Sequence, residues 1–167
     1  VGSSNFDAGQ IAEASSAGAP VQFATAQNEW NLLNRAVEAE IVPACEAAGV
    51  SMIPFFPLAS GMLTGKYQRG EVFQEGSRLA AMSFFASIAT EENFSKVETL
   101  TEVARSSDRT LLELALSWLA AQPCVASVIA GATHAEQVAA NARATERAFS
   151  DDELETIETA IAAFDAK

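Results

Sequence analysis

Short apolar runs alternate along the chain with longer stretches that are apolar on one side and polar on the other. The short runs have the length and the β-branched or aromatic content of buried strands. We expect strands at 1–4 (the end of one), 21–27, 50–56 and 124–130. The longer stretches predict helices at 8–18, 34–49, 91–105, 110–121, 133 to about 147, and from 150 onward.

Residue types that cap helices mark the ends of these segments. Gly18 and Gly49 are predicted to end the first two helices, and Pro43 is expected to kink the second. Three later helices start with a Ser or Thr followed three residues on by Glu, a capping box. These pairs are Thr110 and Glu113, Thr133 and Glu136, and Ser150 and Glu153.

The order of strands and helices predicts right-handed βαβ units and about four parallel strands. A long polar, glycine-bearing loop over about 57–90 interrupts the order, and a loop of that length indicates a functional or mobile segment. Ligands of such sheets bind at the carboxyl ends of the strands. The stretches "SN", "QNE", "FFPLASG" and "GATHAEQ" all fall at those ends, so we expect them to converge on one face.

Composition restricts the classes of function. The length of 167 residues fits one domain, 1–167, and a net charge of −12 argues against nucleic-acid or anionic-membrane partners. Cys45 and Cys124 lie in apolar stretches and are expected to be reduced core residues. The sequence contains no apolar run of membrane-spanning length and no visible signal peptide, which predicts a cytoplasmic protein.

Taken alone, each candidate site residue has two interpretations. Ser4, Asn5 and Gln27 carry groups that can pair with a carboxamide or a sugar, or can simply cap helices and loops. An aromatic such as Phe55 can stack on a flat ring or belong to the core. Lys66 can supply charge to an anion or be solvated. The glycine turn at "GAT" precedes a helix N-terminus, which favours phosphate, but many strand-to-helix turns have this composition.

The joint order of several motifs narrows the choice. "VGSSNF", "QNEWNLLNR", "IPFFPLASGMLTGKY", "GSR", "LALSWLAAQP" and "SVIAGATHAEQVAAN" follow one another as in the aldo-keto reductases, and the resemblance covers essentially the whole chain. It is strongest to the subgroup with bacterial reductases and potassium-channel β subunits. The resemblance implies a (β/α)₈ TIM barrel that binds extended NADPH, with this chain as its truncated second half, lacking the amino-terminal half.

The resemblance also implies the role of each site residue. Ser4, Asn5 and Gln27 would hold the nicotinamide carboxamide, and Phe55 would stack on the nicotinamide ring. The remaining cofactor-binding residues match the pyrophosphate loop (Pro57, Leu58, Ala59, Ser60), the phosphate belt (Lys66, Ser77, Arg78) and the adenosine end (Gly131, Thr133, Gln137, Asn141).

This sequence departs from the family pattern at several positions. Phe56 stands where Ser is frequent, and Ala140 replaces a Glu that would contact adenine. No Lys or Arg lies between Gly131 and Asn141, so NADPH is favoured over NADH only by Thr133, Arg78 and helix amides.

Catalytic residues are a further departure. The family's catalytic Tyr, Lys, Asp and His belong to the missing half, and the single tyrosine, Tyr67, lies in the "GKY" loop. We therefore assign no catalytic residue, and His134, the one histidine, is not expected to be catalytic or to bind metal.

A half-barrel would expose two strand edges and an apolar inner face. A missing amino-terminal half or a second copy of the chain would cover these surfaces, or the chain would fold its own helices over the open face, and the sequence does not decide among the three. The complete protein is expected to reduce aldehydes or ketones to alcohols. The alternatives are a non-catalytic binding or assembly protein and an unrelated α/β fold with a phosphate site at residue 131.

Overall fold

The structure is a computed structural model that describes residues 1–17, 22–71 and 87–165. The chain divides into two compact units. The first contains Val1–Pro57 and Leu119–Gly131, and the second contains Leu58–Trp118 and Ala132–Lys167.

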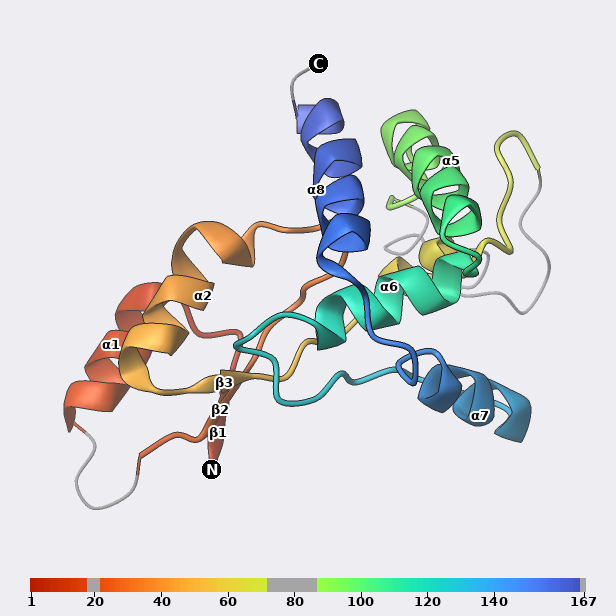
Figure 1. Ribbon diagram of the computed structural model, residues 1–167. Helices are drawn as coiled ribbons and strands as arrows, with labels where there is room; N and C mark the ends of the chain where they lie inside the picture. Colours follow the sequence, from red (N-terminus) through yellow and green to blue (C-terminus); the bar gives the residue numbers. More distant parts are fainter. Residues whose placement is uncertain (18–21, 72–86, 166–167) are drawn as a thin grey trace. The chain divides into compact units, whose positions relative to one another are not determined.

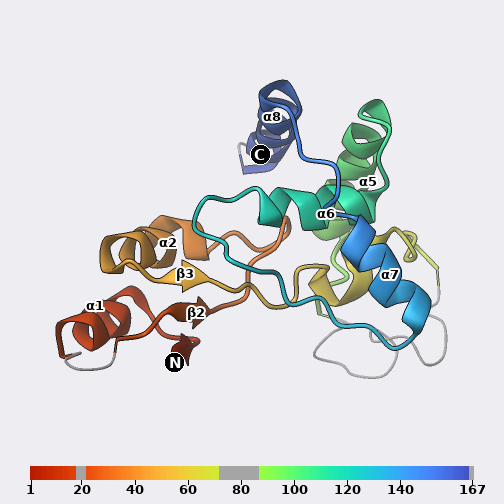
Figure 2. The ribbon, with the colours of Figure 1, turned by 60° about the horizontal axis from the view of Figure 1, so that its bottom comes forward.

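A three-stranded parallel sheet forms the centre of the first unit. Its strands are β1 (Gly2–Ser4), β2 (Thr25–Gln27) and β3 (Ser51–Met52), in the order β1-β2-β3. Each connection between neighbouring strands carries a helix, α1 (Ala8–Ala17) or α2 (Val37–Ala48). The two helices lie side by side next to the sheet (Figures 1 and 2). The expected α/β fold with parallel strands and flanking helices is therefore confirmed, whereas the half-barrel stays a prediction.

Alternation along the strands separates the two faces of this sheet. Ser3 and Ala26 are buried, while their neighbours Ser4 and Gln27 are exposed and half-buried, respectively. Successive strand residues point to opposite faces, so the polar groups of Ser4 and Gln27 share the face opposite to Ser3 and Ala26. The parallel register sets Ser4 opposite Gln27.

Helix α2 ends where the sequence predicted. Gly49 has φ 66°, and its N–H bonds back to the carbonyl of Glu46, which closes the last turn. Glycine reaches this left-handed conformation without the clash that a Cβ atom would cause. Pro43 lies inside the helix.

The expected fourth strand at 124–130 is wrong as a regular strand. Only Val125 makes a parallel bridge, to Met52, among the described residues of this segment. Hydrogen bonds from Met52 N to Cys124 O and from Ile129 N to Pro54 O keep the segment beside β3. It therefore follows the edge of the sheet without the continuous ladder that would define a strand.

Helices make up most of the second unit, which begins with the 3₁₀ helix η1 (Ala59–Thr64) inside the predicted long loop. The later elements are α5 (Glu91–Ser106), α6 (Leu111–Ala120), α7 (Ala135–Arg143) and α8 (Asp151–Asp165). Helices α5 and α8 pack side by side (Figures 1 and 2). Among the described residues, no helix is long and apolar enough to cross a membrane.

Two of the three predicted capping boxes are confirmed. Glu113 accepts the Thr110 N–H at 2.6 Å while Thr110 Oγ1 accepts the Glu113 N–H, and Ser150 and Glu153 repeat this exchange. The third is wrong. The N-cap of α7 is His134, and Thr133 bonds to Gln137 in place of Glu136.

Candidate functional site

The carboxyl ends of β1 and β2 bring together Ser4, Asn5 and Gln27. The Asn5 N–H donates to the Gln27 carbonyl at 2.9 Å, and Asn5 Nδ2 donates to Ser4 Oγ at 3.2 Å. Asn5 has φ 57°, which turns the chain sharply at the end of β1. The side chains of Ser4 and Asn5 are exposed and that of Gln27 is half-buried, so hydroxyl and amide groups are available to a ligand here.

Phe55 lies next to the segment that follows Gln27. Its N–H donates to the Asn28 carbonyl at 3.1 Å, and it forms a parallel bridge with Glu29. The half-buried Phe55 ring meets Phe56 edge-on, with centroids 5.2 Å apart. Pro57 is buried at the end of the first segment of the first unit, Val1–Pro57. The exposed Gly131 follows Ile129, whose N–H bonds to the carbonyl of Pro54.

A left-handed turn carries Leu58, Ala59 and Ser60 in the second unit. Ala59 has φ 45°, Ser60 has φ 56° and Gly61 has φ 100°. The Leu58 carbonyl accepts the Gly61 N–H at 2.8 Å and closes the turn. Ser60 is only 2% exposed, and its Oγ has no hydrogen-bond partner among the described residues. A buried hydroxyl without a partner is costly, and strained backbone clusters at sites that bind ligands, so this turn is a candidate binding element.

Lys66 follows this turn and is exposed. Its Nζ lies 4.8 Å from the centre of the Tyr67 ring, a cation–π contact. A Cβ atom at Gly61 would approach Lys66 Cε to 2.9 Å, so glycine there leaves room for the lysine stem. Ser77 and Arg78, the other members of the predicted phosphate belt, lie outside the described residues.

The start of α7 holds the adenosine-end candidates of the second unit. Gln137 Oε1 accepts hydrogen bonds from Thr133 N at 2.8 Å and from Thr133 Oγ1 at 3.1 Å. Asn141 lies one turn further along and is half-buried. Thr133 and Gln137 therefore bond to each other at the helix start, where the two donors of Thr133 point at a side-chain oxygen.

Among the described residues, the ionisable groups with a shifted pKa lie outside the predicted cofactor set. Burial raises the pKa of the Cys45 thiol, with further contributions from Cys124 and Glu46, and burial likewise raises the pKa of Cys124. Both thiols are free, and Cys45 is buried as expected for a core residue, whereas Cys124 is only half-buried. No group of three or more potential metal ligands occurs in the described ranges.

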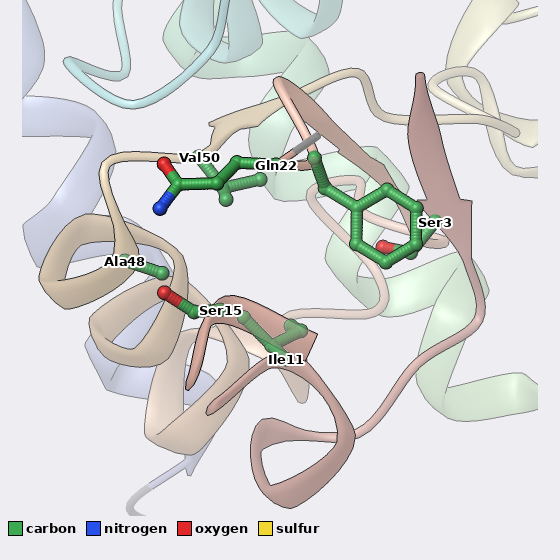
Figure 3. Close-up of a pocket in the computed structure, with 7 residues that line it drawn as sticks. Ser3, Ile11, Ser15, Gln22, Ala48 and Val50 are labelled. Atoms are coloured by element: carbon green, nitrogen blue, oxygen red, sulfur yellow. The ribbon is translucent and has the colours of Figure 1, made fainter. Parts of the chain in front are cut away.

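A small cavity lies in the first unit near the amino ends of β2 and β3, away from the carboxyl ends that carry Ser4, Asn5 and Gln27 (Figure 3). It encloses about 280 Å³, including space that is open to solvent. None of its lining residues belongs to the predicted cofactor set or is acidic or basic; they are Ser3, Ile11, Ser15, Gln22, Phe23, Ala48 and Val50. The cavity therefore offers no acid–base chemistry.

Two buried asparagines, Asn28 and Asn31, were missed by the sequence analysis. They are 6% and 1% exposed and bond to the loops that follow β1 and β3. The signal was present in "QNEWN", because Asn28 has the same parity as the buried Ala26 and a buried amide needs a partner.

Comparison with known proteins agrees with this arrangement of parallel strands and helices. The model of the aldo/keto reductase family matches residues 1–162. L-glyceraldehyde 3-phosphate reductase of Escherichia coli (strain K12) is 36% identical over 143 residues, which are 81% of this chain and 41% of that protein. A probable voltage-gated potassium channel subunit beta of Oryza sativa subsp. japonica is 35% identical over 151 residues, 86% of this chain and 45% of that protein.

The fold is of the α/β class with a parallel sheet, and the family match covers nearly the whole chain. The chain belongs to the aldo/keto reductase family. Its relatives include both bacterial reductases and potassium-channel β-subunit-like proteins, as the sequence motifs predicted. The chain spans less than half the length of the curated relatives it matches.

Proposed function

We propose that the chain is the NADP(H)-binding, carboxyl-terminal half of a (β/α)₈ barrel whose complete form reduces aldehydes or ketones to alcohols. The observation that carries this proposal is the register between β1 and β2, which sets Ser4 opposite Gln27 with Asn5 bonded to both. Three neighbouring hydroxyl and amide groups match the donors and acceptors of a carboxamide. Family membership and the match over 1–162 support the same interpretation.

The nicotinamide end of the cofactor would bind to the first unit. Gln27 and Asn5 would pair with the carboxamide, which fixes the face of the ring that points at the substrate, and Phe55 would stack against the ring. Bound NADPH would supply the hydride. The residues of this chain would bind the cofactor, orient it and exclude water from it.

The phosphate and adenosine ends would bind to the second unit. Leu58, Ala59 and Ser60 would contact the pyrophosphate after Pro57, and the unpartnered Ser60 hydroxyl fits a ligand that supplies acceptor oxygens. Lys66, Ser77 and Arg78 would close over the phosphates, where Lys66 and Arg78 would neutralise charge. At the adenosine end, a 2′-phosphate would have to replace Gln137 Oε1 as the acceptor for the Thr133 donors.

We propose separately that the chain binds NADPH in preference to NADH. A relative from Escherichia coli (strain K12), 32% identical over 155 residues, is named NADH-specific methylglyoxal reductase. This chain also has no Lys or Arg between Gly131 and Asn141. Competition between NADPH and NADH for the chain would decide the preference, and equal affinities would contradict a 2′-phosphate site.

Catalysis would require a group from outside this chain. Hydride transfer to a carbonyl needs a general acid within hydrogen-bond reach of the carbonyl oxygen. The one tyrosine, Tyr67, is buried beside Lys66 in the loop after η1 and does not match the family's acid. We propose that a missing amino-terminal half or a second copy of the chain completes the barrel in the cytoplasm.

A second candidate function is non-catalytic binding or assembly. It is favoured by the similarity to proteins named potassium channel subunit beta in both Oryza sativa and Arabidopsis thaliana. Cofactor binding does not separate the two functions, because both are compatible with it. Turnover does, because only the first function predicts it for the completed barrel.

NADPH titration by fluorescence tests the proposed function. Saturable binding is expected, and Gln27→Ala is expected to weaken it about tenfold because hydrogen bonds to the carboxamide are lost. Gln22→Ala is the matched control, since it removes the same side chain near the amino end of β2. Arg78→Ala is also expected to weaken binding. Unchanged affinity in both Gln27→Ala and Arg78→Ala would contradict the assignment of the site.

A further inference from the structure

Two buried side-chain amides connect the strand ends that carry the nicotinamide-binding residues. Asn28 and Asn31 follow β2 and are 6% and 1% exposed. A buried amide is retained at low cost only where it is hydrogen-bonded, so the partners of these two side chains indicate what they do.

Asn28 connects the segment after β2 to the loop after β1. Its Nδ2 donates to the Phe6 carbonyl at 3.2 Å, across 22 residues of sequence. Its Oδ1 is buried and has no hydrogen-bond partner among the described residues. Within that part of the chain, the side chain therefore bonds only to the Phe6 carbonyl. The amide therefore acts chiefly as a donor that holds one carbonyl.

Asn31 makes the corresponding connection to the loop after β3. Its Nδ2 donates to the Phe56 carbonyl at 3.1 Å and, more weakly, to Glu29 Oε1 at 3.4 Å. Its Oδ1 accepts the backbone N–H groups of Leu33 and Asn34, both at 2.9 Å. The side chain thus fixes its own loop and uses its donor to hold the neighbouring one.

Both carbonyls adjoin strained backbone at the predicted site. Asn5, which precedes Phe6, has φ 57°, and Phe56, which follows Phe55, has φ 52°. Residues with a Cβ atom adopt this conformation only when the surrounding structure holds them there. The bonds from Asn28 and Asn31 supply that restraint on the two sides of Gln27.

We infer that Asn28 and Asn31 are positioning residues that hold Asn5 and Phe55 in the geometry needed to bind the nicotinamide end of the cofactor. This inference rests on the proposed function, because it assigns Asn5 and Phe55 to nicotinamide. A purely structural role would stabilise the chain without distinguishing one end of the cofactor from the other.

Asn28→Leu and Asn31→Ser are the test variants. Leucine has the same branched arrangement of heavy atoms as asparagine and removes both the donor to Phe6 and the unpartnered acceptor, so the fold should be retained. Serine at position 31 can still accept from the following backbone N–H groups but is too short to reach Phe56. Asn93→Leu is the matched control, because Asn93 Nδ2 donates to the Ile88 carbonyl at 2.7 Å in the second unit.

Affinity for two ligands separates positioning from stability. Each test variant should bind NADPH about fivefold to tenfold more weakly, as expected for one lost hydrogen-bonded restraint, and should bind adenosine 2′,5′-bisphosphate as tightly as the parent chain. Asn93→Leu should bind both as the parent does. Unchanged NADPH affinity, or an equal loss for both ligands, would overturn the inference.

Amide exchange measured by NMR on the ligand-free chain keeps the test independent of the proposed function. The Asn5 N–H, bonded to Gln27 O, should exchange faster in Asn28→Leu, and the Phe55 N–H, bonded to Asn28 O, should exchange faster in Asn31→Ser. If the parent chain binds no NADPH, the proposed function fails. Faster exchange would then still support the restraint itself, whereas unchanged exchange would refute it.

Discussion

The proposed role of Ser60 in binding the cofactor can be tested against a purely structural role at the scale of a single hydroxyl. Its Oγ is buried and has no partner among the described residues, whereas Thr64 Oγ1 in the same turn donates to the Gly61 carbonyl at 2.7 Å. Ser60→Ala should leave the free energy of unfolding within about 1 kcal/mol of the parent, because it removes no hydrogen bond. It should weaken NADPH binding severalfold, as measured by fluorescence titration.

Thr64→Val is the control for this prediction. It removes a bonded hydroxyl from the same turn at nearly constant size, so urea unfolding should show a loss of about 1 kcal/mol. A loss of stability in Ser60→Ala as large as that in Thr64→Val, with NADPH binding intact, would show that Ser60 has only a structural role.

Arg109 is a buried cation of the second unit whose guanidinium contacts two backbone carbonyls and an aromatic ring. Its guanidinium donates to the carbonyls of Arg147 and Ala148 at 2.8 and 2.7 Å and lies 4.1 Å from the centre of the Phe149 ring. The side chain is 2% exposed. Arg109→Lys should lower the free energy of unfolding by about 2–4 kcal/mol, because an ammonium cannot reproduce this planar set of donors.

Arg69→Lys is the comparison for Arg109→Lys. Arg69 pairs with Glu91 and Glu98 on the surface, and its side chain is 37% exposed. Its replacement should cost much less, because solvent screens exposed ion pairs. Thermal and urea unfolding of both variants would check this order, and an equal loss in the two would contradict the stabilising role assigned to the buried contacts of Arg109.

Helix α6 links its stability to pH through its capping box. Hydrogen bonds from the Thr110 N–H and hydroxyl lower the pKa of Glu113, although burial partly opposes them. A lowered folded-state pKa stabilises the fold above the ordinary carboxyl value of about 4.3, and this contribution is lost as pH falls toward the lowered value. Urea unfolding between pH 3 and 7 should therefore show falling stability at the acid end.

Glu113→Gln tests the assignment of this pH dependence. Glutamine can still accept from Thr110 but does not titrate, so the variant should lose part of the acid dependence while keeping most of the cap. Thr110→Ala should instead cost about 1 kcal/mol at neutral pH. An unchanged pH profile in Glu113→Gln would assign the dependence to other groups, among them Glu153, whose pKa is lowered by the Ser150 N–H.

Elements whose determinants are local were the ones that the sequence predicted well. The caps at Thr110 and Ser150 and the glycine end of α2 depend on residues within four positions, and the structure confirms them. The cap at Thr133 was predicted with the wrong partner, because Gln137 competes with Glu136 for the same N–H. The strand at 124–130 failed since its regularity depends on pairing with distant β3.

The features of the candidate site also differ in how well the sequence predicts them. Parallel pairing made it predictable that Ser4 and Gln27 would lie together, because strands of one sheet end at one edge. The left-handed turn at Ala59 and Ser60 could not be predicted from the sequence pattern, because neither Ala nor Ser has a local preference for positive φ. The pattern in "QNEWN" indicates that Asn28 is buried, but the partners of Asn28 and Asn31 could not be predicted, because these bonds join segments more than 20 residues apart.

Assembly is a property of the whole molecule. The proposed half-barrel would expose strand edges and apolar surface, which are seldom left uncovered. We expect a 17.6 kDa chain to form a dimer by light scattering, with the intact mass measured on the same sample. A monodisperse monomer that binds NADPH would contradict the need for a covering partner.

Turnover is the prediction that separates a cofactor-binding half from a complete enzyme. With NADPH and 4-nitrobenzaldehyde, the 167-residue chain alone should consume cofactor no faster than buffer, because it offers no matched general acid. Tyr67→Phe, which removes the one tyrosine, should then change nothing. Turnover abolished by Tyr67→Phe would make Tyr67 the acid and overturn our assignment of the loop. Turnover that survives the substitution would require an acid that is not a tyrosine. Background rates with saturable NADPH binding are the result that the proposed function requires, since the chemistry would then belong to the half that completes the barrel.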